Sequence, residues 1–454
     1  MSQVSSNRLR WGLAAAVTAL LTACAAGPGP QTPPPAGPPS PPPASGEPER
    51  PGDNGPAPAR PVGPFESSGH AQMDAWRADF ASRAQAQGRD REVIRSVLEG
   101  ISPLETFLGS AFTTQSSGIE DQAEFAKPIW EYLSSTVTST RKRIGADKLA
   151  ANTALFDRLE AEYGVDREVL TAIWGMETSY GGFIGSNDAA NTLANMAVEG
   201  RRRRFAEGEL IALMKILEQG LAERDDLVSG WAGAMGQTQF MPSTFLAHAE
   251  DFTGDGKIDV WNSRADALAS AANYLAVSGY RSGEPWGLEV VLPDGFDYSH
   301  ADGKDRRLAT WRSLGLAAAR GERLDAGGAE FAELWVPAGH RGPKFLLFRN
   351  FDVFKTYNRA DSYALAVGLL SQGVQGRDSP VADWPSDIRP LSVAQVKRLQ
   401  AGLNDLGYGA GPVDGIPGRM TKSALRRFQA DRGLIADGFP TASMLSLVLE
   451  AAGS

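Results

Sequence analysis

Residues 164–182 read "GVDREVLTAIWGMETSYGG", and this stretch decides the fold of the central part of the chain. Asp166 is a favourable N-cap residue and the glycines at 181 and 182 are natural helix stops, so we expect one helix between them. Within that helix Glu177 directly follows the nearly uncharged run "VLTAIWGM". Its position needs an explanation, because acidic side chains usually stay in water.

Glu177 lies on the apolar face of the predicted helix. The other members of that face are Leu170, Ile173 and Trp174. Because Glu177 follows Trp174 by three residues, it projects towards the core with them. A carboxyl group that loses hydration favours its protonated form, and it can then donate a proton to a leaving glycosidic oxygen. The residues alone leave another interpretation open, in which Glu177 is a buried acid paired with an arginine.

The composition is that of a globular protein with more than one domain. The 454 residues are 42% hydrophobic and 22% charged, which suffices for a sizeable buried core. The net charge of −9 and the pI near 5.2 argue against nucleic acid as a partner, because phosphate binding needs a clustered basic surface.

The N-terminal segment has the pattern of an export signal. Arg8 and Arg10 precede the apolar run "WGLAAAVTALL", which is too short to span a bilayer. The run leads into "LTAC", which resembles the lipobox of bacterial lipoproteins, where the cysteine, here Cys24, becomes the lipidated first residue. Ala25 follows, as in the outer-membrane sorting pattern. The alternative is an ordinary cleaved signal with an incidental cysteine.

Changes in composition divide the chain into five segments. Residues 1–23 are the predicted signal peptide, and residues 24–69 carry the cysteine and a Pro-rich tether. Residues 70–378 form a mainly α-helical domain with a small inserted β subdomain, indicated by helical periodicity and by short strands such as "WGLEVVLP". A linker at 379–390 precedes a predicted three-helix module at 391–452.

Several motifs in one order resemble a known family. They are "GVDREVLTAIWGMETSYGG", "GRRRRFAEGELIALM", "GWAGAMGQTQFMPSTF", "DFTGDGKIDVW" and "ANYLAVSGY". Together they resemble the lytic murein transglycosylase B family, glycoside hydrolase family 103, over roughly residues 71–375. The run "LNDLGYGAGPVDGIPGRMTKSALRRFQ" is similar to a peptidoglycan-binding domain.

The resemblance implies a lysozyme-like helical enzyme that cuts the β-1,4 bond between N-acetylmuramic acid and N-acetylglucosamine without water. Glu177 matches the family's single catalytic acid, which protonates the glycosidic oxygen and then acts as base while the muramic acid 6-hydroxyl attacks its own C1. The product is a 1,6-anhydro end. The sequence alone does not exclude a second carboxylate of the kind that ordinary glycosidases use, and the nearest are Asp188, Glu199 and Glu209.

The same resemblance implies a set of residues that contact the glycan. The matching positions are Tyr132, Arg201, Arg202, Gln239, Phe240, Tyr274, Tyr357 and Tyr363. The chain departs from the family at Gly230, where a serine often stands, and Ser229 one position earlier is the candidate substitute. We expect either that Ser229 takes its place after a backbone shift or that the hydroxyl is dispensable.

An acidic loop, "DFTGDGKIDVWN", follows the EF-hand pattern. Its expected ligand positions are Asp251, Thr253, Asp255, Lys257, Asp259 and Asn262. The family has a calcium site here, so we expect Ca²⁺ to bind, more weakly than in a sensor because Asn262 replaces the usual bidentate Glu. The ion would be structural, and no cofactor is expected for the reaction. The alternative is an empty Asp/Gly turn.

The predicted partners are peptidoglycan strands and, through the lipid anchor, the outer membrane, which places the protein in the periplasm; the sequence names no protein partner. Three other functions stay open. A zinc amidase or peptidase is disfavoured because the four histidines lie far apart. A muramidase-type hydrolase and a non-catalytic peptidoglycan-binding lipoprotein remain as alternatives.

Overall fold

The computed structural model describes residues 62–108, 128–321, 323–377 and 380–453. The chain divides into two units, 1–59 and 60–454, and every described residue belongs to the second. The predicted signal peptide, Cys24 and nearly all of the tether therefore lie outside the described residues. No helix among the residues described has the length and apolar character needed to cross a membrane.

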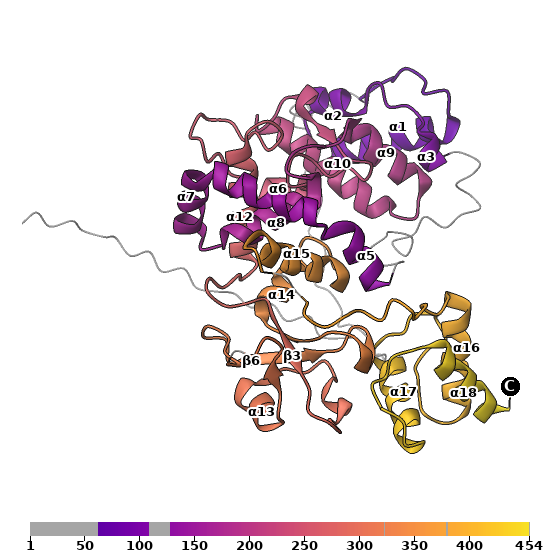
Figure 1. Ribbon diagram of the computed structural model, residues 1–454. Helices are drawn as coiled ribbons and strands as arrows, with labels where there is room; N and C mark the ends of the chain where they lie inside the picture. Colours follow the sequence, from indigo (N-terminus) through magenta and orange to yellow (C-terminus); the bar gives the residue numbers. More distant parts are fainter. Residues whose placement is uncertain (1–61, 109–127, 322, 378–379, 454) are drawn as a thin grey trace, which may run out of the picture. The chain divides into compact units, whose positions relative to one another are not determined.

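Helices dominate the described residues (Figure 1), as the sequence predicts. Those before the sheet are α1 (Ala71–Ala86), α2 (Arg91–Leu98), α3 (Glu105–Leu108), α5 (Ile129–Thr136), α6 (Ser139–Ala151), α7 (Thr153–Tyr163), α8 (Arg167–Thr178), α9 (Ala189–Glu199), α10 (Arg203–Glu218), α11 (Pro242–His248) and α12 (Arg264–Val277). Later helices are α13 (Leu308–Ser313), α14 (Arg349–Phe354), α15 (Asp361–Val374), α16 (Val393–Asp405), α17 (Arg419–Asp431) and α18 (Ala442–Ala452). The first helix, α1, begins at Ala71, next to the start of the helical domain that the sequence predicts at 70–378.

The inserted β subdomain is a five-stranded antiparallel sheet with the order β4-β6-β7-β3-β5. Its strands are β3 (Gly287–Val291), β4 (Arg306–Arg307), β5 (Ala317–Ala318), β6 (Phe331–Trp335) and β7 (Lys344–Leu347). A separate short pair, β1 (Asn187–Asp188) and β2 (Val228–Ser229), joins two loops of the helical body. The prediction of a small sheet within a helical domain is confirmed.

The predicted helix around Glu177 is α8, but its two ends differ from expectation. Asp166 stands at the N-cap position without a side-chain capping bond. Its carboxylate instead bonds Tyr280 and the backbone amide of Gly283, and burial raises its pKa. The start of α8 is thereby fixed by the segment after α12 rather than by a local cap, which sequence spacing does not show.

The other end of α8 comes earlier than the glycines predict. The helix ends at Thr178, and Ser179 and Tyr180 take left-handed backbone conformations with φ of 50° and 65°. The ring of Tyr180 explains this, because it folds back over Gly175 and meets Trp174 edge-on with 5.7 Å between ring centroids. A Cβ at Gly175 would lie 2.6 Å from that ring, so the packing requires glycine there.

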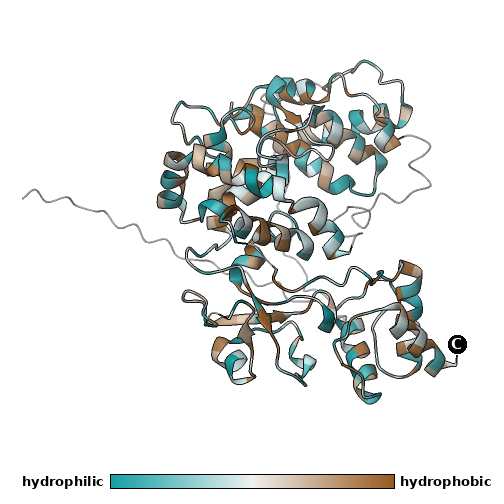
Figure 2. Ribbon diagram, in the orientation of Figure 1, coloured by the Kyte–Doolittle hydropathy of each residue, from teal (hydrophilic) through white to brown (hydrophobic). Residues whose placement is uncertain are grey.

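The core of the helical body forms around α8 and α15. Leu170, Ile173 and Trp174 are buried in one cluster with residues of α15, and the two helices are in contact. Figure 2 shows α15 mainly in white to brown, the colours of apolar residues. This packing brings residue 177 and residues 361–374, far apart in the sequence, to one place.

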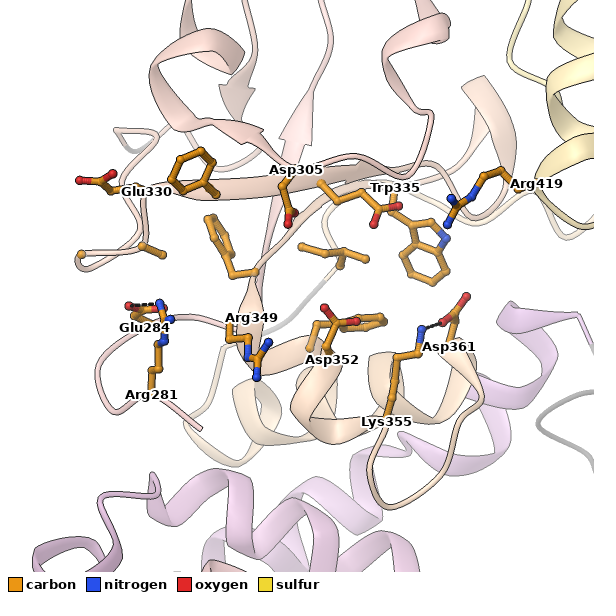
Figure 3. Close-up of a pocket in the computed structure, with 17 residues that line it drawn as sticks. Arg281, Glu284, Asp305, Glu330, Trp335, Arg349, Asp352, Lys355, Asp361 and Arg419 are labelled. Atoms are coloured by element: carbon orange, nitrogen blue, oxygen red, sulfur yellow. Dashed lines mark hydrogen bonds and ion pairs between the residues drawn. The ribbon is translucent and has the colours of Figure 1, made fainter. Parts of the chain in front are cut away.

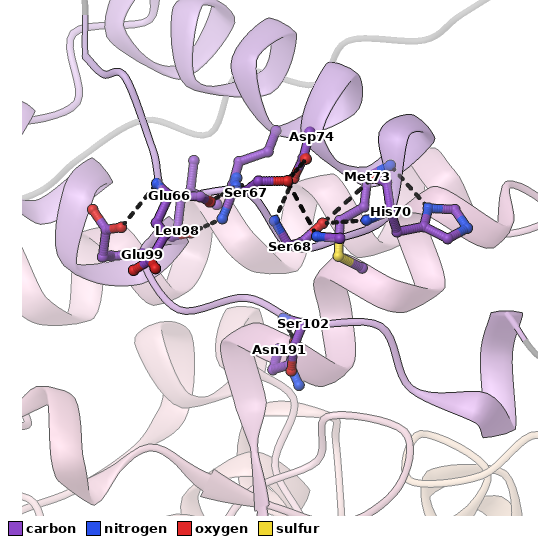
Figure 4. A network of polar contacts seen from close by, with 12 residues as sticks. Glu66, Ser67, Ser68, His70, Met73, Asp74, Leu98, Glu99, Ser102 and Asn191 are labelled. Atoms are coloured by element: carbon purple, nitrogen blue, oxygen red, sulfur yellow. Dashed lines mark hydrogen bonds and ion pairs between the residues drawn. The ribbon is translucent and has the colours of Figure 1, made fainter.

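The N-terminal segment 62–70 is tied to α1 and α2 by polar contacts (Figure 4). Ser67 and Ser68 donate to the carboxylate of Asp74 at 2.7 and 2.9 Å. The guanidinium of Arg77, itself buried, bonds the carbonyls of Glu66 and Leu98 and pairs with Asp74 at 3.0 Å. These contacts hold residues 62–70, which we call the N-terminal strap, against the helical body.

The predicted linker at 379–390 is anchored where it is described. The buried carboxylate of Glu289 accepts the amides of Val381 and Ala382 at 2.6 and 2.8 Å, and Arg341 forms a bidentate pair with Asp387 at 2.9 Å. Beyond it the three predicted helices of the C-terminal module are α16, α17 and α18, which share their own apolar core.

Candidate active site

Glu177 sits in the last turn of α8 and is half-buried, as its place on the apolar face predicts. The hydroxyl of Tyr363, in the first turns of α15, donates a hydrogen bond to Oε1 of Glu177. Tyr363 is almost fully buried, so this bond lies in a poorly hydrated setting where it is stronger than in water. The structure therefore brings two of the predicted site residues into direct contact.

Two tyrosines near Glu177, Tyr357 and Tyr363, have raised pKa values. Burial, and then the charge of Glu177, raise the pKa of Tyr357 and of Tyr363 well above its usual range. Tyr132, from α5, is buried nearby and adds to this effect at Tyr363. Both phenols are therefore neutral hydrogen-bond donors under physiological conditions.

An aromatic wall stands beside the acid. The ring of Phe240 lies 5.8 Å from that of Tyr274 and 6.1 Å from that of Tyr357, and the two tyrosine rings are 5.3 Å apart. Tyr274 donates to the carbonyl of Thr356 at 2.9 Å. The hydroxyl oxygen of Tyr357 is buried and has no hydrogen-bond partner among the described residues, so it is the group best placed to accept a new partner.

His248 joins this wall although sequence reasoning passed over it. Its ring lies 4.7 Å from that of Tyr274, burial lowers its pKa, and its buried Nδ1 has no partner in the described part of the chain. The sequence carries no signal for it, because a lone histidine at the end of a helix has no motif.

Gln239 faces the same region from the loop before α11. Its backbone is left-handed with φ of 51°, and its Nε2 donates to the carbonyl of Gly236 at 3.0 Å and to that of Ile184 at 3.4 Å. A Cβ built on Gly230 would lie 2.8 Å from its Oε1. The amide of Gln239 thus fills the space that a residue 230 side chain would need.

Gln237, two residues earlier, was missed by the sequence analysis. Its Oε1 accepts the indole N–H of Trp174 at 3.1 Å, and its backbone carbonyl accepts the hydroxyl of Thr178 at 2.6 Å. These contacts join the loop before α11 to the last turns of α8. Gln237 therefore fixes the position of Gln239 relative to that of Glu177. The alternation in "QTQF" was the available signal.

The three nearby carboxylates each have a structural partner. Asp188 caps α9 and pairs with Arg224 at 2.6 Å, and Glu199 pairs with Arg201. Buried Glu209 accepts the amide and hydroxyl of Ser243, both at 2.8 Å; this is its role at the start of α11. Their contacts give all three a structural role within the described residues.

Comparison with known proteins identifies the family. Residues 72–372 match the family described as "Transglycosylase SLT domain". The chain belongs to this family. Residues 392–447, which run from the start of α16 into α18, match the peptidoglycan binding domain family.

Individual SLT relatives share both sequence and fold. Membrane-bound lytic murein transglycosylase B of Escherichia coli K12 is 32% identical over 216 residues, which are 47% of this chain and 58% of that relative, less than two thirds of its length. SltB3 of Pseudomonas aeruginosa, solved in complex with NAG-anhNAM-pentapeptide, is 41% identical with a TM-score of 0.76, covering 83% of this chain and 99% of that one. E. coli Slt35, solved in complex with calcium, is 25% identical with a TM-score of 0.52, covering 67% and 92%. The expected lysozyme-like helical fold is thereby confirmed.

Ser229, the candidate substitute for the family's serine, lies in a short strand pair. Ser229 is fully buried in β2, opposite Asn187, and its hydroxyl donates to the carbonyls of Asn187 and Gly230 at 3.4 and 3.1 Å. These contacts favour the second expectation, a dispensable hydroxyl, and the role of Ser229 stays a prediction. Strand pairing turns the side chain inwards, and the space at position 230 is taken by Gln239.

The two arginines before α10, Arg201 and Arg202, differ in their surroundings. Arg201 is exposed and pairs with Glu199. The guanidinium of Arg202 lies over the ring of Phe205 at 4.3 Å, and burial lowers its pKa. Their binding of the glycan stays a prediction.

The acidic loop closes on its own carboxylates. Asp251 accepts the amides of Gly254 and Gly256, both at 2.8 Å, and Asp259 accepts the amide of Asn262 at 2.7 Å. Gly256, at the sixth loop position, has the positive φ of 88° that an EF-hand-like turn requires. The backbone therefore fits such a site, although no group of three or more His, Cys, Asp or Glu within the described residues is placed to hold a metal ion.

A separate cavity of about 760 Å³ lies between the sheet and α14 (Figure 3). Ion pairs border it, Lys355 with Asp361 at 2.7 Å and Arg281 with Glu284 at 3.4 Å. Burial raises the pKa of Glu333 in its lining. Neither Glu177 nor the aromatic wall lines this cavity, so its size does not make it the catalytic site.

Proposed function

We propose that this protein is a lytic transglycosylase, which cleaves the β-1,4 bond between N-acetylmuramic acid and N-acetylglucosamine in peptidoglycan and leaves 1,6-anhydromuramoyl ends. The observation that carries the proposal is a half-buried acid, Glu177, which is bonded by Tyr363 and flanked by an aromatic wall. Family membership and the NAG-anhNAM-pentapeptide in SltB3 of P. aeruginosa support it.

Glu177 first acts as the acid. Its protonated carboxyl donates to the glycosidic oxygen, so the bond to C1 breaks as the leaving sugar takes the proton. The carboxylate that remains is stabilised by the hydroxyl of Tyr363, because a bond to a charged acceptor is stronger than one to a neutral group. Glu177 then accepts the proton of the muramic acid 6-hydroxyl as that oxygen attacks C1, which restores the acid.

The internal hydroxyl explains why one carboxylate suffices. An ordinary glycosidase needs a second acid to activate water or to form a covalent intermediate. Here the attacking oxygen belongs to the same sugar and is already held beside C1. The structural partners of Asp188, Glu199 and Glu209 agree with a site that has no such second acid.

The aromatic wall and Gln239 would hold the sugars. Aromatic rings suit the apolar faces of pyranose rings, and the free hydroxyl of Tyr357 offers a hydrogen bond at the same place. The amide of Gln239 suits an N-acetyl group. The arginines at 201 and 202 suit lactyl or stem-peptide carboxylates.

The test is the chemistry of the products. Purified protein is incubated with peptidoglycan sacculi and the released muropeptides are analysed by mass spectrometry. We expect anhydro ends, lost in Glu177→Gln by at least about 100-fold because the acid and base are removed, and kept in the exposed control Glu92→Gln. Reducing ends would indicate a hydrolase, and binding without cleavage would indicate a scaffold; either result would refute the proposal.

We further propose that Cys24 is lipidated and anchors the protein to the outer membrane, with the Pro-rich tether and the C-terminal module guiding it to the wall. The lipobox pattern supports the anchor, and the similarity to the membrane-bound lytic murein transglycosylase B of E. coli agrees with it. Intact-mass analysis and membrane fractionation test it. Cys24→Ser should move the protein to the soluble periplasmic fraction, and an unchanged membrane fraction would refute the anchor.

We also propose a structural Ca²⁺ at the loop 251–262. The side-chain oxygens of Asp251, Asp255 and Asp259 and the carbonyl of Lys257 would hold it after a small rearrangement. Calcium should raise the unfolding temperature of the wild type and not that of Asp251→Asn. An equal response of the two proteins would refute the site.

A further inference from the structure

Two aromatic side chains near the site are exposed to an unusual degree. Trp231 is 63% exposed and Phe183 is 72% exposed, whereas the next most exposed aromatic residue described, Phe331, is 47% exposed. Rings of this size gain free energy when they leave water, so leaving two of them uncovered opposes solubility. Neither was assigned a role by sequence motifs or by the mechanism above.

The two loops that carry these rings are packed against each other. A Cβ on Gly185 would lie 2.1 Å from the carbonyl oxygen of Ser229, so the backbones at these positions are in close contact. Asn187 pairs with Ser229 in the β1–β2 ladder. Phe183 and Trp231 each lie two residues from this contact, so both rings stand on the surface of two loops that touch.

This surface adjoins the reacting groups. The amide of Phe183 bonds the carbonyl of Thr178, the residue that follows Glu177, at 3.1 Å. The carbonyl of Ile184 accepts the side-chain amide of Gln239 at 3.4 Å. The segment that carries Phe183 is thus bonded directly to the end of α8 and to Gln239, the two places from which the proposed site is built.

The backbones beneath the rings are fixed. Trp231 lies in a turn closed by the amide of Gly230 on the carbonyl of Ala234 at 2.8 Å, and the amide of Gly233 returns to the carbonyl of Gly230 at 3.2 Å. A rigid backbone with an uncovered ring is the arrangement of a preorganised binding surface, because little entropy is lost on binding.

We propose that Phe183 and Trp231 form an aromatic platform that binds a sugar ring of the glycan strand beyond the two sugars joined by the cleaved bond. The rings match the apolar face of a pyranose, and no charged group is needed for that contact. The platform deepens the proposed function and rests on it. It would make the enzyme prefer longer strands, because only these reach both the acid and the platform.

Binding to Glu177→Gln separates the platform from the chemistry. The probes are peptide-free glycan strands of four and eight sugars, measured by calorimetry. Binding of the eight-sugar strand by this parent variant is the check on the proposed function; its absence would overturn that function. We expect Trp231→Ala and Phe183→Ala in the parent to weaken binding of the longer strand by about 5- to 20-fold each. Phe331→Ala, an exposed aromatic on β6, is the matched control and should change nothing.

Active enzyme gives the second readout. Trp231→Ala should raise KM for the longer strand with kcat within about twofold, because a contact made equally in the ground state and the transition state does not change kcat. Trp231→Phe should restore most of the affinity. Unchanged binding in folded Trp231→Ala and Phe183→Ala would overturn the proposal, and so would an equal loss on four-sugar and eight-sugar strands, since that would put the rings beside the cleaved bond.

Discussion

Gly230 gives the sharpest prediction, because a single atom, Oε1 of Gln239, opposes a side chain at this position. A Cβ there would lie 2.8 Å from Oε1 of Gln239, closer than side-chain atoms tolerate. The backbone of Gly230 is outside the left-handed region, so alanine is allowed by conformation and only the contact opposes it. Gly230→Ala therefore forces the amide of Gln239 to move.

The cost follows from what Gln239 loses. Its Nε2 makes bonds of 3.0 and 3.4 Å to the carbonyls of Gly236 and Ile184, and each is worth about 0.5–1.5 kcal/mol. Their loss costs about 1–3 kcal/mol. Replacing glycine by alanine returns about 0.4–1 kcal/mol by restricting the unfolded chain. The net expectation is a destabilisation of between about 0 and 2.6 kcal/mol.

A double-mutant cycle isolates this contact. Urea unfolding is measured for wild type, Gly230→Ala, Gln239→Ala and the double variant. With the amide already removed, Gly230→Ala should be neutral or stabilising by up to about 1 kcal/mol. Additive effects of the two substitutions would refute the reasoning, because they would mean that the residues do not compete for space. Gly230→Ser should behave like the alanine variant, and should also raise KM if Gln239 binds the sugar.

The remaining predictions concern Tyr363 and Asp74. Tyr363→Phe should lower kcat about 10- to 100-fold without unfolding the protein, since a hydrogen bond to a charged group contributes about 1.5–3 kcal/mol; steady-state rates check this, and a kcat within twofold of wild type would contradict it. Because the pKa of Tyr363 is raised well above 10, its ionisation should produce no loss of activity below that pH. The pKa of Asp74 is lowered to about 2 by hydrogen bonds from Ser67 and Ser68, so its contribution to stability is present above its ordinary pKa of 3.8 and is lost as the pH falls towards 2. In Asp74→Asn the free energy of unfolding should change less with pH over that range than in the wild type. The same pH dependence in both proteins would argue against the contacts of Asp74 with the N-terminal strap.

The sequence by itself determined the elements and the acid. Periodicity placed Glu177 on the apolar face of α8, short β-branched runs marked β3, β6 and β7, and the order of the motifs indicated the family. The helices, the strands and the place of Glu177 are local features, since each depends on residues within one or two turns of one another, and the order of the motifs is read directly along the chain. Local patterns are therefore enough to predict helices, strands and a candidate acid.

Only the tertiary structure decided what surrounds that acid. Tyr363 reaches Glu177 because α15 packs on α8, and the two residues are 186 positions apart in the chain. The side chain of Asp166 bonds Tyr280 instead of capping α8. The side chain of Ser229 is buried in β2, and the amide of Gln239 occupies the space beside Gly230. These outcomes depend on which side chains compete for one volume and one set of hydrogen bonds, and that competition is set by long-range packing, which no spacing along the chain records.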